Sequence, residues 1–480
     1  MLSPIVLTDE QQAAYNTIGV TKTLFLSGAA GCGKSVIITE RMKNDTTGKF
    51  ILCATTNQAC RILSEKLNTG KQVPTLQSVL NMKPIYDGST KNEDKLIDFY
   101  FQVPPKNFTS LVGMHLIIDE ASMICKNTQH YLLELIELEH LESVTFVGDK
   151  YQLPCVKKEP FEYHRIDKVI ELQYVKRANG ELLDYYNQIR KDVINDEELS
   201  MFEHARYFDT TEEFSAYIKN IEGSKCVISW TNQAADTFSK LIDTSEIYEG
   251  KEYTALAYCS FKRLMEDDYE HNTKNDSVSF TTNSNIQILK IFKDYDAMKR
   301  AAAREMYEYK LPKKPVNIEL EIIKYVKVLS EDRDEIYVGI WDAPAKEKET
   351  LYLNNMTRKY RKFLNSIKHK VPTTIWNRYA KEDGYPKSLY NISKHVKFSR
   401  DIIVYELSYW NDFHAIMEAV PVRSIYSTTA HRVQGTTVDV AGINWADISK
   451  GADKKLQYVA LTRAAKELVF YIGDENEAVQ

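Results

Sequence analysis

The sequence has few cysteines and no long apolar run, and each absence excludes a class of protein. All seven cysteines lie in the first 260 residues, and no two form a C-x-x-C pair. An odd number of cysteines without metal-ligand spacing argues against a zinc site and predicts reduced thiols in a cytoplasm. No stretch approaches the apolar length of a membrane span, and the first residues lack the features of a signal peptide. We therefore expect no membrane partner.

The net charge of the whole chain is small, but one segment is strongly basic. The 480 residues carry a formal net charge of −5, which by itself argues against a nucleic-acid partner. Residues 358–400, however, contain twelve Lys or Arg and two acids, so this segment carries +10 and the rest of the chain −15. Aromatic residues are interleaved with these cations, namely Tyr360, Phe363, Trp376, Tyr379, Tyr385, Tyr390 and Phe398. Such a segment suits a single-strand groove, where cations follow phosphates and rings stack on bases; alternatively, the rings pack a small β-rich domain.

An eight-residue motif near the start of the chain matches a phosphate-binding loop. Residues 28–35 fit the pattern G-x-x-x-x-G-K-[ST], and they follow an apolar run at 23–27 that predicts a buried strand. Its three glycines are Gly28, Gly31 and Gly33. They let backbone N–H groups converge on an anion, and the helix expected next adds its positive end. Lys34 is expected to reach the β- and γ-phosphates and the Ser35 hydroxyl to bind Mg²⁺. The motif predicts a site for a nucleoside triphosphate, taken as ATP.

Two adjacent carboxylates follow another apolar run. Residues 115–119 predict a strand that ends at Asp119, and Glu120 comes next. Asp119 is expected to hold Mg²⁺ through water, and Glu120 to polarise the water that attacks the γ-phosphate. Acidic pairs also end strands at surfaces without any catalytic role. Together with a phosphate loop, the pair favours a hydrolase.

The first half of the chain alternates short apolar runs with helical stretches, which predicts a parallel sheet with helices on both faces. The expected strands are 23–27, 49–55, 115–119 and 143–148, and the expected helices include 57–68 and 131–141. A second region of this kind begins near residue 177, with strands expected at 225–230, 438–446 and 467–473 and a helix at 233–242. The sequence predicts an α/β fold with two such domains.

Two segments interrupt this alternation. Residues 82–113 contain turn signals and the run Phe99-Tyr100-Phe101, and they are too long for an ordinary connection, which predicts an inserted hairpin or small subdomain. Residues 251–420 are rich in Tyr, Lys and β-formers and predict a long insertion in the second domain. The first domain would then comprise residues 1–81 and 114–176, and the second residues 177–250 and 421–480.

Further motifs follow one another along the chain. They are Leu7-Thr8-x-x-Gln11, Ala54 to Leu63, Thr75-Leu-Gln-Ser78, Val147 to Pro154, Glu171 to Arg177, Trp230-Thr-Asn232, Thr429 to Gly435 and Tyr458 to Arg463. With the phosphate loop and the acidic pair, their order resembles that of superfamily 1 nucleic-acid helicases, most closely the phage Dda-like, RecD-related branch that moves 5′ to 3′. The resemblance implies two RecA-like domains with ATP and Mg²⁺ in the cleft between them.

The resemblance also implies partners and a setting. It implies action on single-stranded DNA and on junctions of single-stranded and duplex DNA, in phage replication or recombination within the host cytoplasm. A monomer is expected, with a single-strand-binding protein or the replisome as a further partner.

Several residues receive nucleotide-linked roles from the resemblance. Gln11 would read adenine, because a carboxamide both donates and accepts hydrogen bonds, although Thr8-x-x-Gln11 is equally a helix capping box. Gln152 would lie close to the γ-phosphate and report the nucleotide state to the bound strand. Arg177 and Arg463 would stabilise the transferring phosphoryl group from across the cleft, as arginine fingers do. The alternative is that each arginine forms an ordinary surface salt bridge.

Strand contacts come from the same resemblance. The residues it assigns are Thr56, Asn57, Thr75, Gln77, Asn232, Thr429, His431 and Arg432. Hydroxyls and helix N-termini there would contact backbone phosphates. The chain departs from the family's pattern at four positions, where Thr55 replaces Pro, Asn57 and Gln77 replace His, and Arg432 replaces Lys.

The two insertions also have counterparts in the family. Residues 82–113 correspond to a pin that splits the duplex, where an aromatic such as Phe101 would stack on the last base pair. Residues 251–420 correspond to an accessory domain that carries an SH3-like barrel in relatives. Both assignments rest on position along the chain.

Other functions share part of this pattern. An RNA helicase, or a translocase without strong unwinding, has the same core motifs. A non-catalytic strand-binding subunit would be expected to lack the phosphate loop or the acidic pair, and both are intact. A small-molecule kinase explains the phosphate loop but not the two arginine motifs. The sequence predicts an ATP-dependent DNA helicase, with the RNA helicase or translocase as the alternative.

Overall fold

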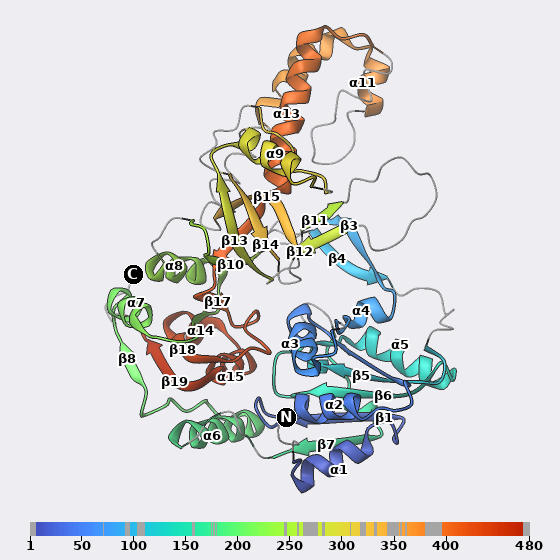
Figure 1. Ribbon diagram of the computed structural model, residues 1–480, viewed down its shortest axis with the longest axis vertical. Coiled ribbons are helices and arrows are strands. Elements are labelled where there is room, and N and C mark those ends of the chain that lie inside the picture. Colours follow the sequence, from blue (N-terminus) through green and yellow to red (C-terminus); the bar gives the residue numbers. More distant parts are fainter. Residues whose placement is uncertain are drawn as a thin grey trace. The chain divides into compact units, whose positions relative to one another are not determined.

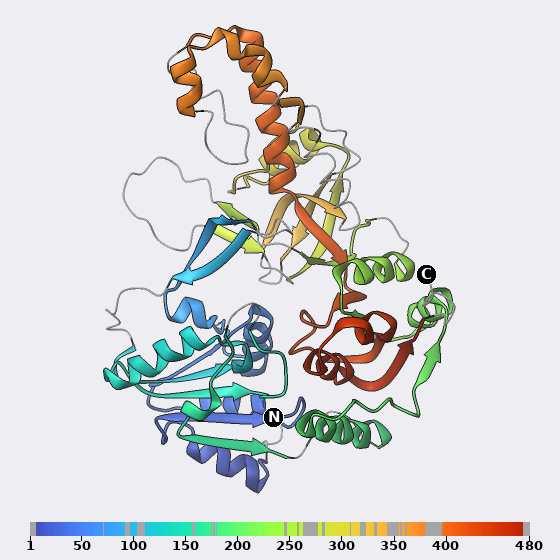
Figure 2. The same ribbon diagram turned by 180° about the vertical axis from the view of Figure 1, so that it is seen from behind.

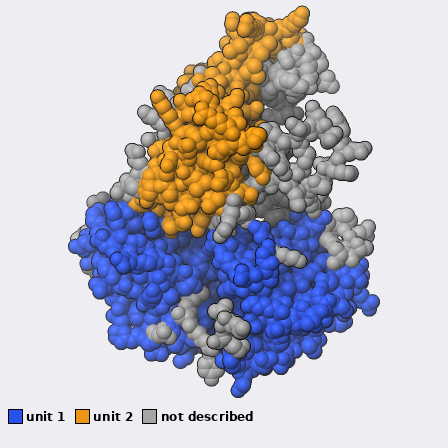
Figure 3. All heavy atoms as spheres, in the orientation of Figure 1, with its two compact units in different colours: residues 1–242, 426–480 blue, residues 243–425 orange. Residues whose placement is uncertain are grey.

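The fold is described from a computed structural model (Figure 1). The described residues are 6–70, 72–91, 97–102, 111–155, 159–173, 175, 178, 180–243, 247–256, 259–262, 277–280, 284–307, 309–316, 323–330, 334–342, 355, 358–360, 362–379 and 396–473. The chain divides into two compact units (Figure 3), unit 1 with residues 1–242 and 426–480 and unit 2 with residues 243–425. Among the described residues, no helix is both long and apolar enough to cross a membrane.

The first half of unit 1 is built on a five-stranded parallel sheet. Its strand order is β2-β5-β6-β1-β7. The strands are β1 Thr23–Gly28, β2 Phe50–Ala54, β5 Met114–Asp119, β6 Leu141–Gly148 and β7 Lys168–Leu172. The helices that accompany them are α1 Asp9–Thr17, α2 Lys34–Lys43, α3 Asn57–Leu67, α4 Leu76–Val79 and α5 Lys126–Glu137, with 3-10 turns at Ala121–Met123 and Tyr163–Arg165. The same sheet is seen from behind in Figure 2.

Each face of this sheet has its own core, because successive side chains of a strand point to opposite faces. Leu24 and Leu26 of β1 belong to the cluster formed with α1, α2 and α3. Phe25, between them, belongs to the cluster formed with α5. The strands are therefore buried on both sides, and this explains why they appear in the sequence as continuous apolar runs.

The second half of unit 1 repeats the plan. Its parallel sheet has the order β17-β9-β18-β19-β8. The strands are β8 Arg206–Phe208, β9 Lys225–Ser229, β17 Ser427–Thr429, β18 Val438–Asn444 and β19 Ala464–Tyr471. The helices are α6 Glu181–Asn195, α7 Thr211–Asn220, α8 Asn232–Ile242, α14 Trp445–Gly451 and α15 Lys454–Leu461. Helices α7 and α8 contribute to the core of one face, and α6, α14 and α15 to that of the other. The prediction of two RecA-like α/β domains is confirmed.

The segment predicted to be an inserted hairpin contains two strands. β3 Lys83–Lys91 pairs antiparallel with β4 Ile97–Gln102, and Pro84 lies opposite Phe101 in the register. Residues 92–96 and 103–110 lie outside the described part of the chain.

Unit 2 contains a closed five-stranded barrel. Its strand order is β10-β13-β14-β15-β16, and the last pair, β15 with β16, is parallel. The strands are β10 Glu252–Ala255, β13 Asn285–Phe292, β14 Lys324–Leu329, β15 Glu335–Asp342 and β16 Val420–Ser424. A separate hairpin pairs β11 Cys259–Lys262 with β12 Ser277–Phe280, and α9 Tyr295–Arg304 packs beside β14. Apolar side chains such as Ile288, Val328 and Val338 are fully buried in the barrel core.

The basic, aromatic-rich segment of unit 2 is mostly helical where it is described. Residues 358–360 and 362–367 are helical, followed by a 3-10 turn at Lys368–Lys370, by α11 Thr373–Tyr379 and by α13 Arg400–Glu418. Tyr360 is fully buried and stacks on Tyr409 with ring centroids 4.1 Å apart, and Trp376 is also buried in this cluster. For these two rings the expectation of base stacking is therefore wrong, because they form the core between helices.

Base stacking by some of the other rings in this segment stays a prediction. Tyr385 and Tyr390 lie outside the described residues, as does the side chain of Tyr379. The predicted limits of the four domains and insertions stay predictions. The two compact units are separated only at residues 242 and 425.

One predicted helix was misplaced. The sequence suggested a helix at 131–141, whereas α5 runs from Lys126 to Glu137 and β6 begins at Leu141. The residue before α5 is Cys125, whose side chain forms no capping hydrogen bond, so the sequence offers no start signal there.

Candidate functional site

The topology of the first sheet brings three motifs to one edge. In a parallel sheet the carboxyl ends of all strands lie at the same edge, where ligands bind in α/β folds. β1 ends at Gly28, β5 at Asp119 and β6 at Gly148, and β6 lies between the other two. Gly148 is aligned with Ser27 in the register of β1 and β6. The phosphate loop, the acidic pair and the predicted coupling motif, which is Val147 to Pro154 with Gln152, are thus neighbours.

The phosphate loop has the backbone that its glycines predicted. Gly31 and Gly33 have φ of +87° and +88°, in the left-handed region that side chains with a Cβ rarely adopt. Gly33 caps α2, and Lys34 is the first residue of that helix. The Lys34 ammonium donates hydrogen bonds to the carbonyls of Gly28, at 2.6 Å, and Ala29, at 2.9 Å. The lysine thus folds back across the loop that would surround a phosphate, and Ser35 is only partly buried beside it.

Gln11 is tied to this loop. Its Oε1 accepts a hydrogen bond from the backbone N–H of Thr8 at 3.1 Å, within a complete capping box at the start of α1. Its Nε2 donates to the carbonyl of Cys32 at 3.1 Å. A Cβ on Gly33 would lie 2.4 Å from this Nε2, so the carboxamide occupies the space that the glycine leaves. The capping-box alternative is confirmed, and the carboxamide also braces the phosphate loop.

The acidic pair lies at the end of β5, where Asp119 is buried and Glu120 is partly exposed. Asp119 is 7% exposed, and burial together with the charge of Glu120 raises the pKa of Asp119 to about 6. Its Oδ1 accepts a hydrogen bond from the backbone N–H of Glu120 at 2.9 Å. Glu120 has a φ of +53°, and its carbonyl accepts a hydrogen bond from the Thr55 hydroxyl at 3.0 Å. Asp119 is thus buried and fixed by the turn, while Glu120 holds a left-handed backbone conformation that non-glycine residues rarely adopt.

The residues at this edge suit Mg²⁺ bound with a nucleotide. A buried carboxylate whose ionised form is disfavoured gains from a nearby cation, and carboxylate and hydroxyl oxygens are the ligands that Mg²⁺ prefers. Asp119 at the end of β5 and Ser35 in the first turn of α2 supply these two groups, and the charge of Lys34, next to Ser35, acts on Asp119. Among the described residues, no group of three or more His, Cys, Asp or Glu side chains is arranged so that it could hold a metal ion.

Residues of the second sheet approach this edge. A Cβ on Gly435, which has a φ of +83°, would lie 3.2 Å from Oε1 of Glu120. Next to it, Gln434 donates a hydrogen bond from Nε2 to Oε1 of Gln152 at 3.5 Å. Both glutamine side chains are buried. The motif after β17 therefore meets the acidic pair and the predicted coupling motif within unit 1.

Arg463 is buried on the second-domain side of this contact. It is 1% exposed, and burial lowers its pKa while the charge of Glu120 opposes that change. Its guanidinium donates to the carbonyl of Val459 at 2.7 Å, to that of Thr436 at 3.4 Å and to the hydroxyl of Thr462 at 3.1 Å. A surface salt bridge is therefore excluded for Arg463. A buried guanidinium held by neutral groups keeps its charge available.

An unanticipated arginine links the two halves of the site. Arg190 of α6 donates to Asp149 Oδ2 at 3.0 Å, to Glu171 Oε1 at 2.8 Å and to the Tyr458 hydroxyl at 3.0 Å. Burial opposes its charge, but Asp149 and its other partners hold the pKa of Arg190 above the usual value. This role could not be predicted from the sequence, because Arg190 lies 41 positions from Asp149 and outside every motif.

The predicted strand-contacting residues lie on both domains. Thr56 and Thr75 are N-caps, and their hydroxyls accept hydrogen bonds from the N–H of Ala59 and Ser78, each at 3.2 Å. The other positions are Asn57 and Gln77 in the first turns of α3 and α4, Asn232 at the start of α8, and Thr429, His431 and Arg432 at and after the end of β17. Of these, Asn57, Asn232 and His431 are exposed, whereas Thr429 is buried.

Two predicted site residues fall outside this description. Arg177 lies outside the described residues. Phe101 is placed in β4 by its backbone, but its side chain is outside the described part. Their roles stay predictions.

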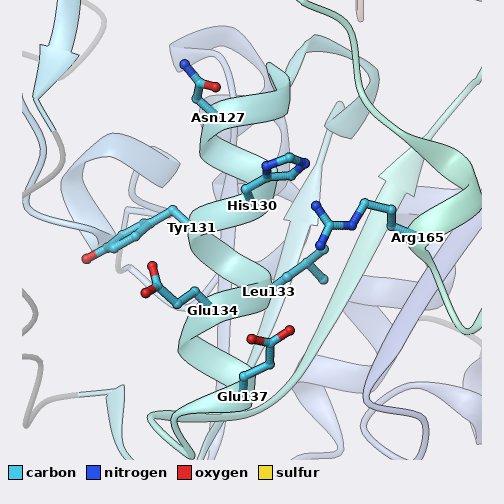
Figure 4. Close-up of a pocket in the computed structure, with 7 residues that line it drawn as sticks. All are labelled: Asn127, His130, Tyr131, Leu133, Glu134, Glu137 and Arg165. Carbon is cyan, nitrogen blue, oxygen red and sulfur yellow. The ribbon is translucent and has the colours of Figure 1, made fainter.

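A pocket on the first domain involves none of the predicted residues (Figure 4). It lies over α5, and Arg165 joins it from the neighbouring 3-10 turn. Its lining residues are Asn127, His130, Tyr131, Leu133, Glu134, Glu137 and Arg165. His130 and Arg165 both approach Glu162, at 2.6 Å and 3.8 Å. Two of its charged groups are thus engaged with Glu162, which is not part of the lining.

Two family models match separate parts of the chain. Residues 11–158 match an AAA domain, and residues 354–472 match the viral superfamily 1 RNA helicase core domain. These matches support a nucleotide-binding helicase core of superfamily 1.

Individual relatives are distant. The chain is 23% identical to the uncharacterized protein MJ1519 of Methanocaldococcus jannaschii, over 97% of this chain and 38% of that protein. It therefore spans about two fifths of the length of this relative. Among solved structures, it is similar to the Pif1 helicase from Candida albicans, with 18% identity, coverage of 98% of this chain and 94% of that chain, and a TM-score of 0.47. It is also similar to the Pif1 helicase from Bacteroides in complex with ADP-AlF3 and single-stranded DNA, with 15% identity, coverage of 97% and 92%, and a TM-score of 0.47.

Proposed function

We propose that the protein is an ATP-driven DNA helicase of superfamily 1, which moves along single-stranded DNA and separates duplex DNA. One observation carries the proposal. Glu120, at the same sheet edge as the phosphate loop, would lie 3.2 Å from a Cβ on Gly435 of the second RecA-like domain, and its charge acts on Arg463 of that domain, all within one compact unit. A nucleotide held by one domain and sensed by the other is the arrangement that converts hydrolysis into domain movement.

The nucleotide would be held by the first domain. Its phosphates would bind the loop N–H groups and the ammonium of Lys34, which would exchange its hydrogen bonds with Gly28 and Ala29 for phosphate oxygens. Ser35 and Asp119 would hold Mg²⁺, which when bound neutralises charge on the phosphate oxygens. Because Gln11 braces this loop through Cys32, it would adjust the loop to the nucleotide as well as read adenine.

Hydrolysis would depend on the opposing domain. Glu120 would orient the attacking water and accept its proton, and Arg463, with Arg177, would stabilise the charge that develops on the phosphoryl group. Gln152 and Gln434 lie on the two sides of the same contact, so loss of the γ-phosphate would be felt at the motif that follows β17. Cycles of closing and opening would then alternate the grip of the two domains on the strand.

Strand binding and strand separation are assigned to residues away from the nucleotide site. Thr56, Thr75 and the exposed Asn57, Asn232 and His431 would contact the strand, together with Gln77, Thr429 and Arg432. The hairpin of β3 and β4 would act as the pin, with Phe101 against the last base pair. Travel from 5′ to 3′, a phage replication or recombination role, a cytoplasmic setting and a single-strand-binding or replisome partner follow from the Dda-like resemblance.

An RNA helicase, or a translocase without strong unwinding, is the second candidate. It is favoured by the match of residues 354–472 to a viral RNA helicase core. The core motifs are shared by both kinds of enzyme, so substrate preference must be measured.

Strand separation on tailed duplexes tests the proposal. Partial DNA duplexes with a 5′ or a 3′ single-stranded tail, and their RNA counterparts, would be mixed with ATP, Mg²⁺ and either the wild-type protein or Lys34→Ala. The proposal predicts that the wild-type protein separates the 5′-tailed DNA and that Lys34→Ala does not. Separation of only the 3′-tailed DNA would overturn the Dda-like branch, and separation of only the RNA would favour the second candidate. ATP hydrolysis without any separation would indicate a translocase.

A further inference from the structure

The cluster around Arg190 joins elements of both core domains. Asp149 follows β6 and Glu171 is in β7, both in the first domain, whereas Arg190 in α6 and Tyr458 in α15 belong to the second. The Tyr458 hydroxyl also donates to Asp149 Oδ2 at 3.2 Å, so this carboxylate oxygen binds both second-domain side chains. Lys150 completes the cluster by pairing with Glu171 at 2.9 Å.

The cluster is buried at its centre, partly exposed at Lys150 and Glu171, and electrically balanced. The Asp149 side chain is 1% exposed and that of Arg190 12% exposed, and two cations face two carboxylates. Taking such charges out of water is costly, and the geometry must be maintained for their attraction to offset that cost. A link of this kind therefore favours one relative placement of the two domains and resists small displacements from it.

Each end of the cluster leads to a residue of the nucleotide site. On the first-domain side, Asp149 shapes the turn that carries Gln152: its Oδ1 accepts from the N–H of Tyr151 at 3.1 Å, and its carbonyl from the N–H of Gln152 at 3.0 Å. On the second-domain side, α15 carries Tyr458 and leads directly to Arg463, whose Nε donates to Val459 of the same helix.

Arg190 itself is held firmly on the second domain. Its helix packs into the core of that domain through Leu182, Tyr185 and Ile189. Tyr186 of the same helix donates a hydrogen bond to the carbonyl of Ala464, next to Arg463, at 2.7 Å. A movement of the Gln152 turn would thus be passed through Arg190 to the segment that carries Arg463.

We propose that Arg190 is a positioning residue that couples the Gln152 turn of the first domain to Arg463 of the second, through Asp149 and Tyr458. The inference rests on the proposed ATP-driven function. It makes Arg190 a determinant of how strongly a bound strand accelerates ATP hydrolysis, while nucleotide binding by the phosphate loop is left in place.

The test compares ATP hydrolysis with and without single-stranded DNA in the wild-type protein and in Arg190→Gln. The quantity of interest is the stimulation ratio, the turnover number with saturating strand divided by that without it. We expect this ratio to fall about tenfold, within the range typical of coupling between sites, while the KM for ATP stays within about twofold of wild type. Arg190→Lys keeps the charge but not the forked geometry, so its ratio should lie between the two.

Lys327→Gln is the matched control. Lys327 lies in the barrel of unit 2, its side chain is 13% exposed, and it pairs with Glu305 at 2.6 Å and Glu335 at 2.5 Å. The Lys327→Gln variant therefore loses a similarly buried, doubly paired cation that lies away from the nucleotide site. Lys327→Gln should lower thermal stability without changing the stimulation ratio.

The outcomes are distinct. A wild-type stimulation ratio in folded Arg190→Gln, or an equal loss in Lys327→Gln, would overturn the inference. If Arg190→Gln does not fold, Tyr458→Phe decides, because it removes one hydroxyl and leaves all charges paired: a lowered ratio supports the coupling and a wild-type ratio overturns it. A wild-type protein without ATP hydrolysis, or without stimulation by a strand, would instead refute the proposed function on which the inference rests.

Discussion

Replacing Asp119 with Asn should stabilise the protein above pH 6, in the absence of metal and nucleotide, while abolishing ATP hydrolysis. Burial and the charge of Glu120 raise the pKa of Asp119 to about 6, from 3.8. The folded state therefore holds this proton more tightly than the unfolded state does. Above pH 6 the ionised form carries the full cost of burial, and the cost declines as pH falls from 6 toward 3.8. It vanishes only below that lower pKa, where the carboxyl is protonated in both states.

The magnitude follows from the size of the pKa change. A rise of about two units corresponds to about 3 kcal/mol at pH 7.5, and to roughly half of that at pH 5. Asn is uncharged at every pH, and its Oδ1 can still accept the hydrogen bond from the N–H of Glu120. Asp119→Asn should therefore raise the free energy of unfolding by about 1–3 kcal/mol at pH 7.5, and by less at pH 5.

Urea unfolding in EDTA at pH 5 and pH 7.5 measures this difference. Asp196→Asn is a control of opposite sign, since Asp196 is exposed and Lys454 lowers its pKa, so that substitution should leave stability unchanged or slightly lower it. An Asp119→Asn variant no more stable than wild type at pH 7.5 would show that this carboxylate bears no desolvation cost. The reasoning that a buried charge awaits a cation there would then be wrong.

Three further substitutions test single parts of the site. Gly33→Ala should abolish nucleotide binding, because the position has a φ of +88° and its Cβ would lie 2.4 Å from Gln11 Nε2; wild-type affinity for a fluorescent nucleotide would contradict the role of the loop. Gly435→Ala places a Cβ 3.2 Å from Glu120 Oε1, at a φ of +83° that costs about 1–2 kcal/mol for other residues. We expect the turnover number for ATP to fall about tenfold or more with nucleotide affinity retained, and an unchanged turnover number would remove the domain contact from the mechanism. Phe101→Ala should reduce unwinding and spare ATP hydrolysis, whereas loss of both activities would place this residue in the core.

The first-domain site could be predicted because its chemistry is local in the sequence. The loop at 28–35 and the pair Asp119–Glu120 each lie at the end of an apolar run, and parallel topology brings all strand ends to one edge. Turn conformation was equally local: Gly31 and Gly33 have the positive φ that the motif requires. These signals needed no knowledge of distant contacts.

Long-range contacts could not be predicted in this way. Arg190 meets Asp149 and Tyr458 only because α6 and α15 share a core, and nothing near Arg190 in sequence marks such partners. In the basic segment, too, long-range packing decides where side chains lie. Its aromatic residues allow two interpretations, a surface for bases or the packing of a small β-rich domain. Tyr360 and Trp376 do pack a core, but that core lies between helices.

ATP hydrolysis as a function of single-stranded DNA concentration, in the wild-type protein and in Lys34→Ala, tests the central claim most directly. The ammonium of Lys34 is the one charge that the phosphate loop itself supplies to the nucleotide. We predict wild-type turnover that rises with strand concentration, and no turnover in Lys34→Ala at any concentration. Normal turnover in Lys34→Ala, or a wild-type rate that no strand changes, would contradict the account.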